Sequence, residues 1–548
     1  MAVFGKLNWL DVHRKAWGSL RGIGAAVAAY ACRVAALVVL GGGAGSAEAA
    51  VRLPAVFGSH MVLQRDRPVV VWGWADAGER ILVQLGPHTK HGQADAQGAW
   101  RVELPAMPAG GPHRLSVAGQ NEVVFDDVML GELWVCSGQS NMAWPLSRAL
   151  NPEQEVAAAK HPGLRLFTMA QSSQPQAQSQ GAGSWAVCDP STAAGFSAVA
   201  YFHGRRLHEE LKVPVGLINT SWGGTRIEAW TPLEAMRARG ELKPLLDYWD
   251  TAVQSFNRDL ARTHHERQLA EWKAKAEEAK ANKKPEPKRP DPPQDPATDR
   301  HRPGNLYNGM VHSLTPLPVR GFIWYQGEGN VTRAYQYRTL LPTLIESWRR
   351  AWGRQDLPFL IVQIAPFGYA KRREGVGPTW CAELWEAQLL TARRVPHTGL
   401  VVTTDVGNAD DIHPRNKQVV GSRLAQWALA TTYGRAELTP GGPMYNRVEL
   451  RGDHAVIHFD YARGLSGRDG KELTHFIAAG EDRVFHPAEA RIEGSTVVVR
   501  CAKVAKPAAV RFAWDELASP NLVNEAGLPA SAFRTDDWPA ATRDRHLP

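Results

Sequence analysis

Three short segments that are apolar almost throughout constrain the fold of this chain most strongly: residues 215–219, 321–325 and 359–363. Helix-favouring stretches fall between such segments, for example residues 337–352. Strands that are apolar on both faces and alternate with helices are typical of a parallel sheet covered by helices on both sides. In such sheets the functional loops lie at the carboxyl ends of the strands. The sequence therefore predicts an α/β domain whose chemistry lies at one edge of its sheet.

The segments on either side of this region have a different pattern. Residues 53–127 contain short strand-like runs, such as 69–74 and 100–104, separated by Gly, Asp and Pro turns. The same alternation returns after about residue 433, for example in 496–500. Closely spaced strands without helical periods between them are typical of small β-sandwiches. We therefore expect β-sandwich-like regions at both ends, the first in a packing or carbohydrate-accessory role.

The start of the chain is typical of an export signal. Basic residues precede the apolar run 34–40, and a small-residue pattern favoured by signal peptidase follows at 47–49. The apolar run is short for the roughly 20 residues that a membrane-spanning helix needs. We expect the mature chain to begin near Ala50 and to be exported, as a periplasmic or secreted protein without a stable membrane anchor.

These patterns divide the chain into four regions and one insertion. The regions are a signal peptide at 1–49, an N-terminal β-sandwich-like domain at 50–127, an α/β domain at 128–432 and a C-terminal β-rich domain at 433–548. The insertion, 235–303, interrupts the α/β domain with a densely charged helix-favouring part, 262–284, and a Pro-rich part, 285–296. We expect a solvated helix followed by an extended segment. A partner-docking arm or a lid near the site is the alternative.

Composition excludes several classes of function. The 63 basic and 55 acidic residues give a net charge of +8, which is modest for 548 residues. The lysines of the insertion are not interleaved with aromatic residues, so we expect no nucleic-acid partner. The five cysteines are widely spread and contain no Cys-x-x-Cys pair, which excludes a zinc ribbon or a dithiol redox motif and leaves one disulfide possible after export.

Ser140 follows the apolar segment 133–136 and is expected at the start of a helix. There its hydroxyl is exposed at the sheet edge, and the backbone N–H groups of the helix start favour a developing negative charge. Gly138 permits the tight turn. The motif is not the G-x-S-x-G elbow of the α/β-hydrolases, because Met142 occupies its last position. A serine after a strand is more often a helix cap than a nucleophile, so Ser140 alone does not indicate catalysis.

A second motif, 410–414, contains a histidine between two aspartates and a proline. The proline suits the first turn of a helix at 416–430, so we expect His413 on the loop before that helix. Asp410, three residues before His413, can accept from the imidazole and support the imidazolium that a nucleophilic serine requires. The alternative is a metal cluster, although hard cations rarely need a histidine. Its members would be Asp405, Asp410, Asp411 and His413.

Two more strand ends carry suitable donors. Residues 219–225 open into a Gly-rich turn, where a backbone N–H can approach a substrate oxygen closely. Residues 325–330 follow another apolar segment, and Gln326 or Asn330 can offer a side-chain amide to an oxyanion. Each segment alone is typical of a turn. Four polar motifs at the strand ends of one sheet together predict an active site.

Four motifs, in this order, resemble those of the sialate O-acetylesterases, a branch of the SGNH hydrolases. They are Gly138-Gln139-Ser140-Asn141-Met142, Ser221-Trp222-Gly223-Gly224-Thr225, Trp324-Tyr325-Gln326-Gly327-Glu328 and Asp411-Ile412-His413-Pro414-Arg415-Asn416-Lys417-Gln418. The similarity extends from about Leu53 to 533–538, whereas the charged insertion departs from it.

The resemblance implies a flavodoxin-like α/β/α catalytic domain with Ser140 as the nucleophile and His413 as its base. The backbone of Gly223 and the amide of Gln326 would join the Ser140 N–H in the oxyanion hole, with Asn330 as a further candidate. The superfamily places the acid three residues before the histidine, as Asp410, while relatives in this branch match the next position, Asp411. Both aspartates stay open at this point.

The implied reaction is a serine esterase mechanism through an acyl-enzyme, without a metal or other cofactor. Its substrate would be an O-acetylated sugar, with sialic acid acetylated at O9 favoured. Trp144, Trp222 and Trp324 lie beside the motifs and are expected to stack on the sugar; packing behind the site is the alternative. An acetyl xylan esterase, another glycan deacetylase and a non-catalytic carbohydrate-binding protein are the other hypotheses. The presence of both Ser140 and His413 argues against the last, and the sequence leaves the oligomeric state open.

Overall fold

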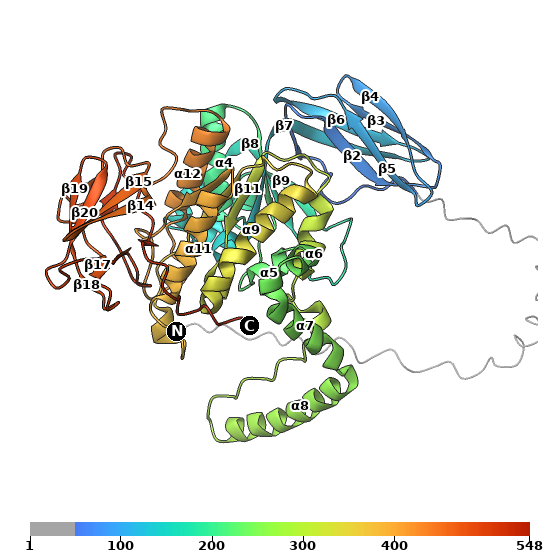
Figure 1. Cartoon of the computed structure of the whole chain (residues 1–548). Helices are drawn as coiled ribbons and strands as arrows, with labels where there is room; N and C mark the ends of the chain where they lie inside the picture. The colour runs from blue at the N-terminus through green and yellow to red at the C-terminus, as the bar shows by residue number, and fades with distance from the viewer. Residues whose placement is uncertain (1–49, 548) are drawn as a thin grey trace, which may run out of the picture. The chain divides into compact units, whose positions relative to one another are not determined.

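A sheet of six parallel strands lies at the centre of residues 50–547, the part of the chain that the computed structural model describes (Figure 1). Its order is β13-β12-β11-β7-β10-β8, with β9 antiparallel to β8 at the edge. Numbered along the chain, the six parallel strands follow the order 6-5-4-1-3-2, with the first of them, β7, in the interior of the sheet. Flavodoxin-like sheets have the order 2-1-3-4-5, so the flavodoxin-like domain stays a prediction. The strands are β7 (Glu122–Gly138), β8 (His161–Met169), β9 (Gly183–Cys188), β10 (Val215–Asn219), β11 (Gly321–Tyr325), β12 (Phe359–Val362) and β13 (Thr398–Val401).

Helices cover both faces of this sheet. Phe359 and Leu360 are neighbours in β12 and so point to opposite faces. Trp348 of α9 (Ala334–Ala351) packs against Phe359, with ring centroids 6.1 Å apart. On the other face the Trp427 ring of α12 (Lys417–Trp427) lies against Gly399, the partner of Leu360 in β13. α4 (Ala198–Leu211) packs on α12, and α11 (Trp380–Arg394) packs on α9.

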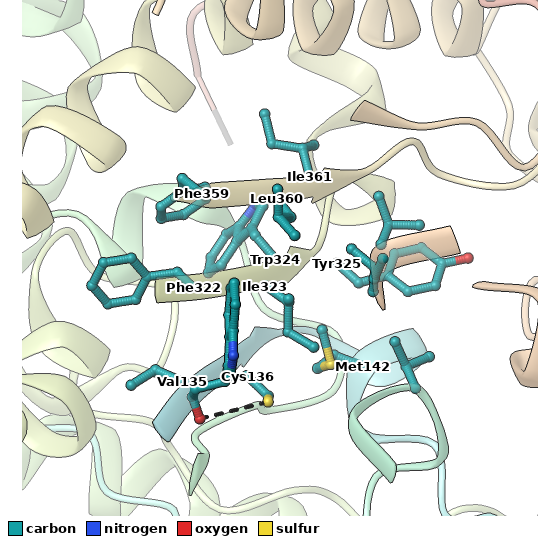
Figure 2. Packing of buried hydrophobic residues seen from close by; sticks show 14 of the residues in the cluster. Val135, Cys136, Met142, Phe322, Ile323, Trp324, Tyr325, Phe359, Leu360 and Ile361 are labelled. Atoms are coloured by element: carbon teal, nitrogen blue, oxygen red, sulfur yellow. Dashed lines mark hydrogen bonds between the residues drawn. The ribbon is translucent and has the colours of Figure 1, made fainter. Parts of the chain in front are cut away.

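The apolar segments form the strands that the sequence predicts. β10 and β11 coincide with the predicted segments, and every residue in them is buried. Figure 2 shows the aromatic and aliphatic side chains of β7, β11 and β12 packed together in the core. The predicted α/β class is therefore confirmed.

The N-terminal region is antiparallel for the most part, and β7 joins it to the central sheet. β3 pairs with β4 and β6, β6 pairs with the first part of β7, and β2 and β5 form a separate pair. β1 runs parallel to the middle of β7. The strand β7 thus continues across the predicted domain boundary at residue 127. A sandwich-like arrangement of the N-terminal region stays a prediction. The strands are β1 (Val62–Gln64), β2 (Val69–Trp74), β3 (Arg80–Leu85), β4 (His88–Gln93), β5 (Ala99–Leu104) and β6 (Gly110–Ala118).

The C-terminal region contains two four-stranded sheets and one short pair, β16 with β22. The first sheet has the order β14-β15-β20-β19 and includes the predicted strand 496–500, and the second has the order β18-β17-β21-β23. The strands are β14 (Met444–Arg451), β15 (His454–Asp460), β16 (Ser466–Gly467), β17 (Phe476–Ala479), β18 (His486–Pro487), β19 (Glu489–Glu493), β20 (Thr496–Arg500), β21 (Ala509–Phe512), β22 (Leu522–Val523) and β23 (Phe533–Arg534).

The charged and Pro-rich parts of the insertion form a hairpin of one long helix and an extended segment. α8 (Arg258–Ala281) has a single buried residue, Ala276, and the following Pro-rich stretch has no regular structure until η3 (Pro296–Thr298). The Trp272 indole donates to the Pro287 carbonyl across the hairpin. In Figure 1 α8 projects away from the central sheet. The predicted solvated helix is confirmed.

The remaining elements connect these parts, and the longest of them, α7, has 13 residues. The α-helices are α1 (Ser140–Ala143), α2 (Pro152–Ala157), α3 (Pro190–Ala193), α5 (Ile227–Trp230), α6 (Leu233–Arg237), α7 (Lys243–Ser255) and α10 (Tyr369–Arg372). The other turns are η1 (Leu146–Arg148), η2 (Gly240–Leu242), η4 (Tyr307–Val311), η5 (His312–Leu314), η6 (Glu328–Arg333) and η7 (Ala428–Thr432).

Two expectations concern the whole chain. The four cysteines within residues 50–547 are buried free thiols, so the possible disulfide does not form among them. The predicted signal peptide, 1–49, lies outside the described residues. Within 50–547 no helix has the length and apolar character needed to cross a membrane.

Candidate active site

The carboxyl ends of three central strands bring the predicted motifs to one edge of the sheet. In register, Gly138 of β7 pairs with Tyr325 of β11, and Cys136 pairs with Asn219 of β10. Gly138 has φ of 142°, and a Cβ there would lie 2.1 Å from the Tyr325 carbonyl oxygen, so only glycine fits. Ser140 follows as the first residue of α1. Its hydroxyl therefore lies at the sheet edge.

Ser140 and His413 are in contact, although 273 positions separate them. The His413 Nε2 atom lies 2.8 Å from the Ser140 Oγ atom. His413 belongs to the loop before α12, whose first residue is Lys417 and whose N-cap, Asn416, accepts from the Val419 N–H. Pro414 thus precedes the helix, and the prediction that it sits in the first turn is wrong because Asn416 caps the helix later.

Asp411 is the carboxylate beside the imidazole. Its Oδ1 atom accepts from the His413 backbone N–H at 2.9 Å and lies 3.7 Å from Nδ1, beyond direct hydrogen-bonding range. Asp410 instead binds Arg372 at 2.9 Å, and its side chain is 78% exposed. The structure therefore brings Asp411, and not Asp410, to His413.

The alternative metal cluster does not assemble. Asp405 is paired with Arg423 at 2.6 Å, and Asp410 with Arg372. Within residues 50–547 no group of three or more His, Cys, Asp or Glu side chains is arranged to hold a metal ion.

Trp144 holds the imidazole in place. Its ring stacks on His413, with centroids 4.8 Å apart and planes 17° apart, and the Arg148 guanidinium lies 4.4 Å from its centroid. Trp144 therefore contacts the imidazole and Arg148 in this structure, and its stacking on a sugar stays a prediction.

The surroundings of His413 favour its neutral form. Burial lowers the pKa of the imidazole, the charges of Lys417 and Arg148 lower it further, and only Asp411 raises it. A neutral imidazole has one ring nitrogen free to accept a proton, and Nε2 faces the Ser140 hydroxyl. This geometry suits general-base chemistry at neutral pH.

Two backbone donors beside Ser140 have no acceptor. Within residues 50–547 the N–H groups of Ser140 and Gly223 donate to no other group. A Cβ on Gly223 would lie 3.3 Å from the Ser140 Cβ, so this Gly-rich turn lies directly against the serine. Such free donors can stabilise an oxyanion that forms on a group attached to Ser140.

Gln326 and Asn330 do not face the site. Both are 0% exposed. The Gln326 amide donates to the Thr225 carbonyl and to the Asn330 Oδ1, and the Asn330 amide donates to Glu228. Their predicted place in the oxyanion hole is therefore wrong in this structure, because their donors already connect two loops inside the protein.

Trp324 is also part of the core. It is 0% exposed and packs edge-to-face with Trp230 and Trp348. The prediction that it contacts substrate is wrong, since its ring points from β11 toward α9. Trp222 is only partly buried and remains at the edge of the site.

A buried polar chain behind Ser140 was missed by sequence reasoning. Asn141 donates to Glu328 and to the Ile412 carbonyl, and accepts from Lys417; the three side chains are at most 5% exposed. Burial lowers the pKa of Lys417 to about 7 and raises that of Glu328. The available signal was spacing, because Asn141 adjoins Ser140 and Lys417 lies four residues after His413.

Comparisons with known proteins identify the family of this chain. A family described as "Carbohydrate esterase, sialic acid-specific acetylesterase" matches residues 130–268 and 297–430, leaving out much of the α8 hairpin. A crystal structure of a novel carbohydrate acetylesterase from Xanthomonas citri has a TM-score of 0.75 and 37% identity, covering 89% of this chain and 100% of that one. The chain belongs to this carbohydrate esterase family. It is therefore a carboxylic ester hydrolase.

Curated relatives of this esterase are also similar along most of its length. The sialate O-acetylesterase of Rattus norvegicus is 27% identical over 510 residues, covering 84% of this chain and 89% of the rat protein. The sialate O-acetylesterase of Homo sapiens is 27% identical over 453 residues, covering 75% and 76%. The similarity thus extends beyond the α/β region of the esterase. Because the chain belongs to a family of esterases, the hypothesis of a non-catalytic carbohydrate-binding protein is wrong.

Proposed function

We propose that this esterase removes O-acetyl groups from sialic acid, with the 9-O-acetylated sugar as its substrate. Ser140 is the nucleophile, His413 the general base and Asp411 the carboxylate that supports the imidazolium. The observation that carries the proposal is the 2.8 Å contact between Ser140 Oγ and His413 Nε2 at the sheet edge. The relatives named sialate O-acetylesterases support the choice of sugar.

In the proposed first half-reaction, His413 removes the hydroxyl proton of Ser140 as Oγ attacks the acetyl carbonyl carbon. The N–H groups of Ser140 and Gly223 donate to the oxyanion of the tetrahedral intermediate. His413 then gives its proton to the departing sugar oxygen, which leaves an acetyl group on Ser140. Water, deprotonated by His413, attacks this acyl-enzyme and releases acetate.

Asp411 acts when the imidazole gains its proton. The carboxylate lies 3.7 Å from Nδ1, close enough to stabilise a positive charge on the ring. Its bond to the His413 backbone N–H holds the loop in this position. Trp144 fixes the ring plane from one side.

A second candidate function is deacetylation of another glycan, such as acetylated xylan. The observation that favours it is the 37% identity to a structure described only as a carbohydrate acetylesterase, compared with 27% to the sialate enzymes. The two candidates share the same proposed chemistry at Ser140. They differ in the sugar alone.

Acetate release from 9-O-acetylated sialic acid, measured beside acetylated xylan, tests both candidates. We expect the sialic acid ester to be the better substrate. Ser140→Ala should lower kcat by at least about 1,000-fold, because the nucleophile is lost. Ser147→Ala, at an exposed serine nearby, is the matched control. Equal turnover by wild type and Ser140→Ala would end the catalytic assignment, and turnover of xylan alone would favour the second candidate.

We further propose that residues 1–49 direct export to the periplasm or the exterior, without a stable membrane anchor. The small-residue pattern at 47–49 supports a cleavage site. The proposed regions of the mature chain are 50–127, 128–432 and 433–548, with β-sandwich-like accessory folds flanking a three-layer catalytic domain. The antiparallel pairing at both ends supports this division. N-terminal sequencing of the exported protein tests the cleavage site.

A further inference from the structure

Two guanidinium groups at the edge of the site lack an acidic partner. Arg300 lies over the Trp222 ring, with its Cζ 5.9 Å from the centroid. The Arg226 side chain lies against η6. Its Cγ atom would be 3.5 Å from a Cβ placed on Gly329. Within residues 50–547 neither side chain forms a salt bridge or donates a side-chain hydrogen bond.

The acidic groups nearest to these arginines are engaged elsewhere. Glu228 is bonded to the buried Arg333, and the Asp299 carboxylate accepts from the His301 backbone N–H. Burial lowers the pKa of Arg226, the charges of Glu228 and Asp299 raise it, and the charges of Arg333 and Arg373 lower it further. Partly buried charges in proteins are normally paired, because desolvation is costly without an opposite charge. This edge of the site therefore has an excess of positive charge that suits an anionic ligand.

Arg300 lies within the reach of one substrate molecule bound at Ser140, and Arg226 follows Gly224 by two residues in the same loop. A Cβ on Gly223 would be 3.3 Å from the Ser140 Cβ, and a Cβ on Gly224 would be 3.9 Å from the Arg300 Nη2. Since consecutive Cα atoms are 3.8 Å apart, Arg300 Nη2 is no more than about 14 Å from the serine. The partly exposed Trp222 precedes Gly223 and has Arg300 over its ring. The nucleophile, the aromatic ring and the Arg300 guanidinium thus belong to one neighbourhood.

We propose that Arg300 and Arg226 form a carboxylate-binding subsite beside Trp222, which selects acetylated sugars that carry a carboxylate over neutral ones. This inference rests on the proposed esterase function of Ser140. A guanidinium binds a carboxylate through two parallel N–H donors, which fixes the orientation of the sugar as well as its charge. Trp222 then contacts the sugar between its carboxylate and its ester.

The experiment compares three esters: 9-O-acetyl-N-acetylneuraminic acid, its C1 methyl ester and 4-nitrophenyl acetate. The methyl ester removes the negative charge and keeps the sugar, while 4-nitrophenyl acetate reports on Ser140 alone. We expect the wild type to prefer the free acid over the methyl ester in kcat/KM by about 10- to 100-fold. Arg300→Gln and Arg226→Gln should each reduce that preference, mainly through KM, and leave 4-nitrophenyl acetate hydrolysis unchanged.

Arg289→Gln is the matched control. Arg289 lies over Trp272 at 5.8 Å, nearly the geometry of Arg300 over Trp222, but on the α8 hairpin. It should leave the preference for the free acid intact. If Arg226→Gln does not fold, Arg300→Gln at the partly exposed position carries the test, with circular dichroism as the check of folding.

Other results would overturn the subsite. A wild type that hydrolyses acid and methyl ester equally, or an Arg300→Gln variant that keeps the full preference, contradicts it. An equal loss on all three esters would indicate a structural role instead. A wild type that hydrolyses 4-nitrophenyl acetate but no sialic acid ester contradicts the proposed substrate. The subsite is then tested by comparing acetylated galacturonic acid with acetylated galactose. Equal rates of hydrolysis on these two esters would contradict the proposed subsite.

Discussion

The imidazole of His413 is held by three neighbours of different chemistry. Ser140 contacts Nε2, Trp144 stacks on the ring and Asp411 lies near Nδ1. The side chain is 27% exposed, so the ring is partly screened from water while remaining open to a substrate. The sequence left open whether Asp410 or Asp411 is the carboxylate among these neighbours.

Replacing Asp411 by Asn tests its role against that of Asp410. The Asp411→Asn variant loses the charge beside Nδ1 and should lower kcat by at least about 10-fold, because the imidazolium in the transition state is less stable. Asp410→Asn should keep kcat near the wild-type value, since Asp410 binds Arg372 at the surface. Steady-state kinetics with one acetyl ester compares the two. A larger loss in Asp410→Asn would assign the supporting role to that residue.

Lys417 should control the pH dependence of the esterase. His413 works as a base when neutral, so kcat/KM falls as the pH drops through its pKa. The positive charge of Lys417 lowers that pKa. In Lys417→Met this contribution is gone, and the acid limb of the kcat/KM profile should move to higher pH by up to about one unit.

Lys417→Arg keeps the charge and provides the comparison for this shift. Its acid limb should stay close to that of the wild type, while Lys371→Met, at an exposed lysine, should change nothing. Because Lys417 is bonded to Asn141, thermal melting of each variant separates loss of folding from the pH effect. An unmoved acid limb in a folded Lys417→Met would contradict the prediction.

Side-chain direction explains which site residues the sequence could predict. Ser140 and His413 are the residues whose chemistry matches a known pairing, and the structure brings them together. Gln326 and Asn330 stand at a strand end as well, but the turn after β11 directs their amides into the protein, toward Thr225 and Glu228. The spacing of residues along the chain does not predict where these side chains point, because the geometry of the loop determines it.

At the scale of elements, the sequence predicted best where one physical rule dominates. β10 and β11 are continuous apolar runs in the middle of the sheet, and their bounds coincide with the prediction. β13 has only four residues, one of them a glycine that makes room for Trp427, so it has little pattern of its own. The β8–β9 hairpin likewise depends on pairing with the sheet edge.

The α8 hairpin should be dispensable for folding. α8 has one buried residue, and the Arg258–Asp295 ion pair joins the two ends of the hairpin at its base. Replacing residues 262–291 by a short Gly/Ser linker keeps that pair and adds little loop-closure entropy. We expect Tm to change by no more than about 4 °C and acetyl ester hydrolysis to persist.

Calorimetry and kinetics on the shortened protein check this prediction. A variant with the same linker in place of 280–291 alone leaves most of α8 in place and controls for the linker itself. A folded protein that loses activity only when α8 is removed would instead indicate that the helix acts near the site, as the lid alternative proposes.

At the scale of the whole molecule, Glu132 connects the regions that β7 joins. Its carboxylate is 0% exposed and binds Arg65 from the N-terminal region, Arg320 before β11 and the hydroxyl of Tyr433 after α12. The Trp134 indole also donates to Tyr433. One buried anion thus holds two arginines from distant parts of the chain.

Removing this anion should destabilise the molecule and change its response to acid. Glu132→Gln leaves two partly buried guanidinium groups without their charge partner, which should lower the free energy of unfolding by about 3–5 kcal/mol. Glu346→Gln, in a half-exposed pair with Arg239, is the control and should lower it by less than about 1 kcal/mol.

Burial by itself would raise the pKa of Glu132, but Arg320 and Arg65 bring it below its ordinary value of 4.5. A carboxyl with a lowered folded pKa contributes stability above its unfolded pKa and loses it as the pH falls through the folded value. The difference in unfolding free energy between wild type and Glu132→Gln should therefore be full at pH 7 and shrink below pH 4.5. Urea unfolding at both pH values measures it, and a difference that does not shrink in acid would mean that the carboxylate charge is not what holds the two regions together.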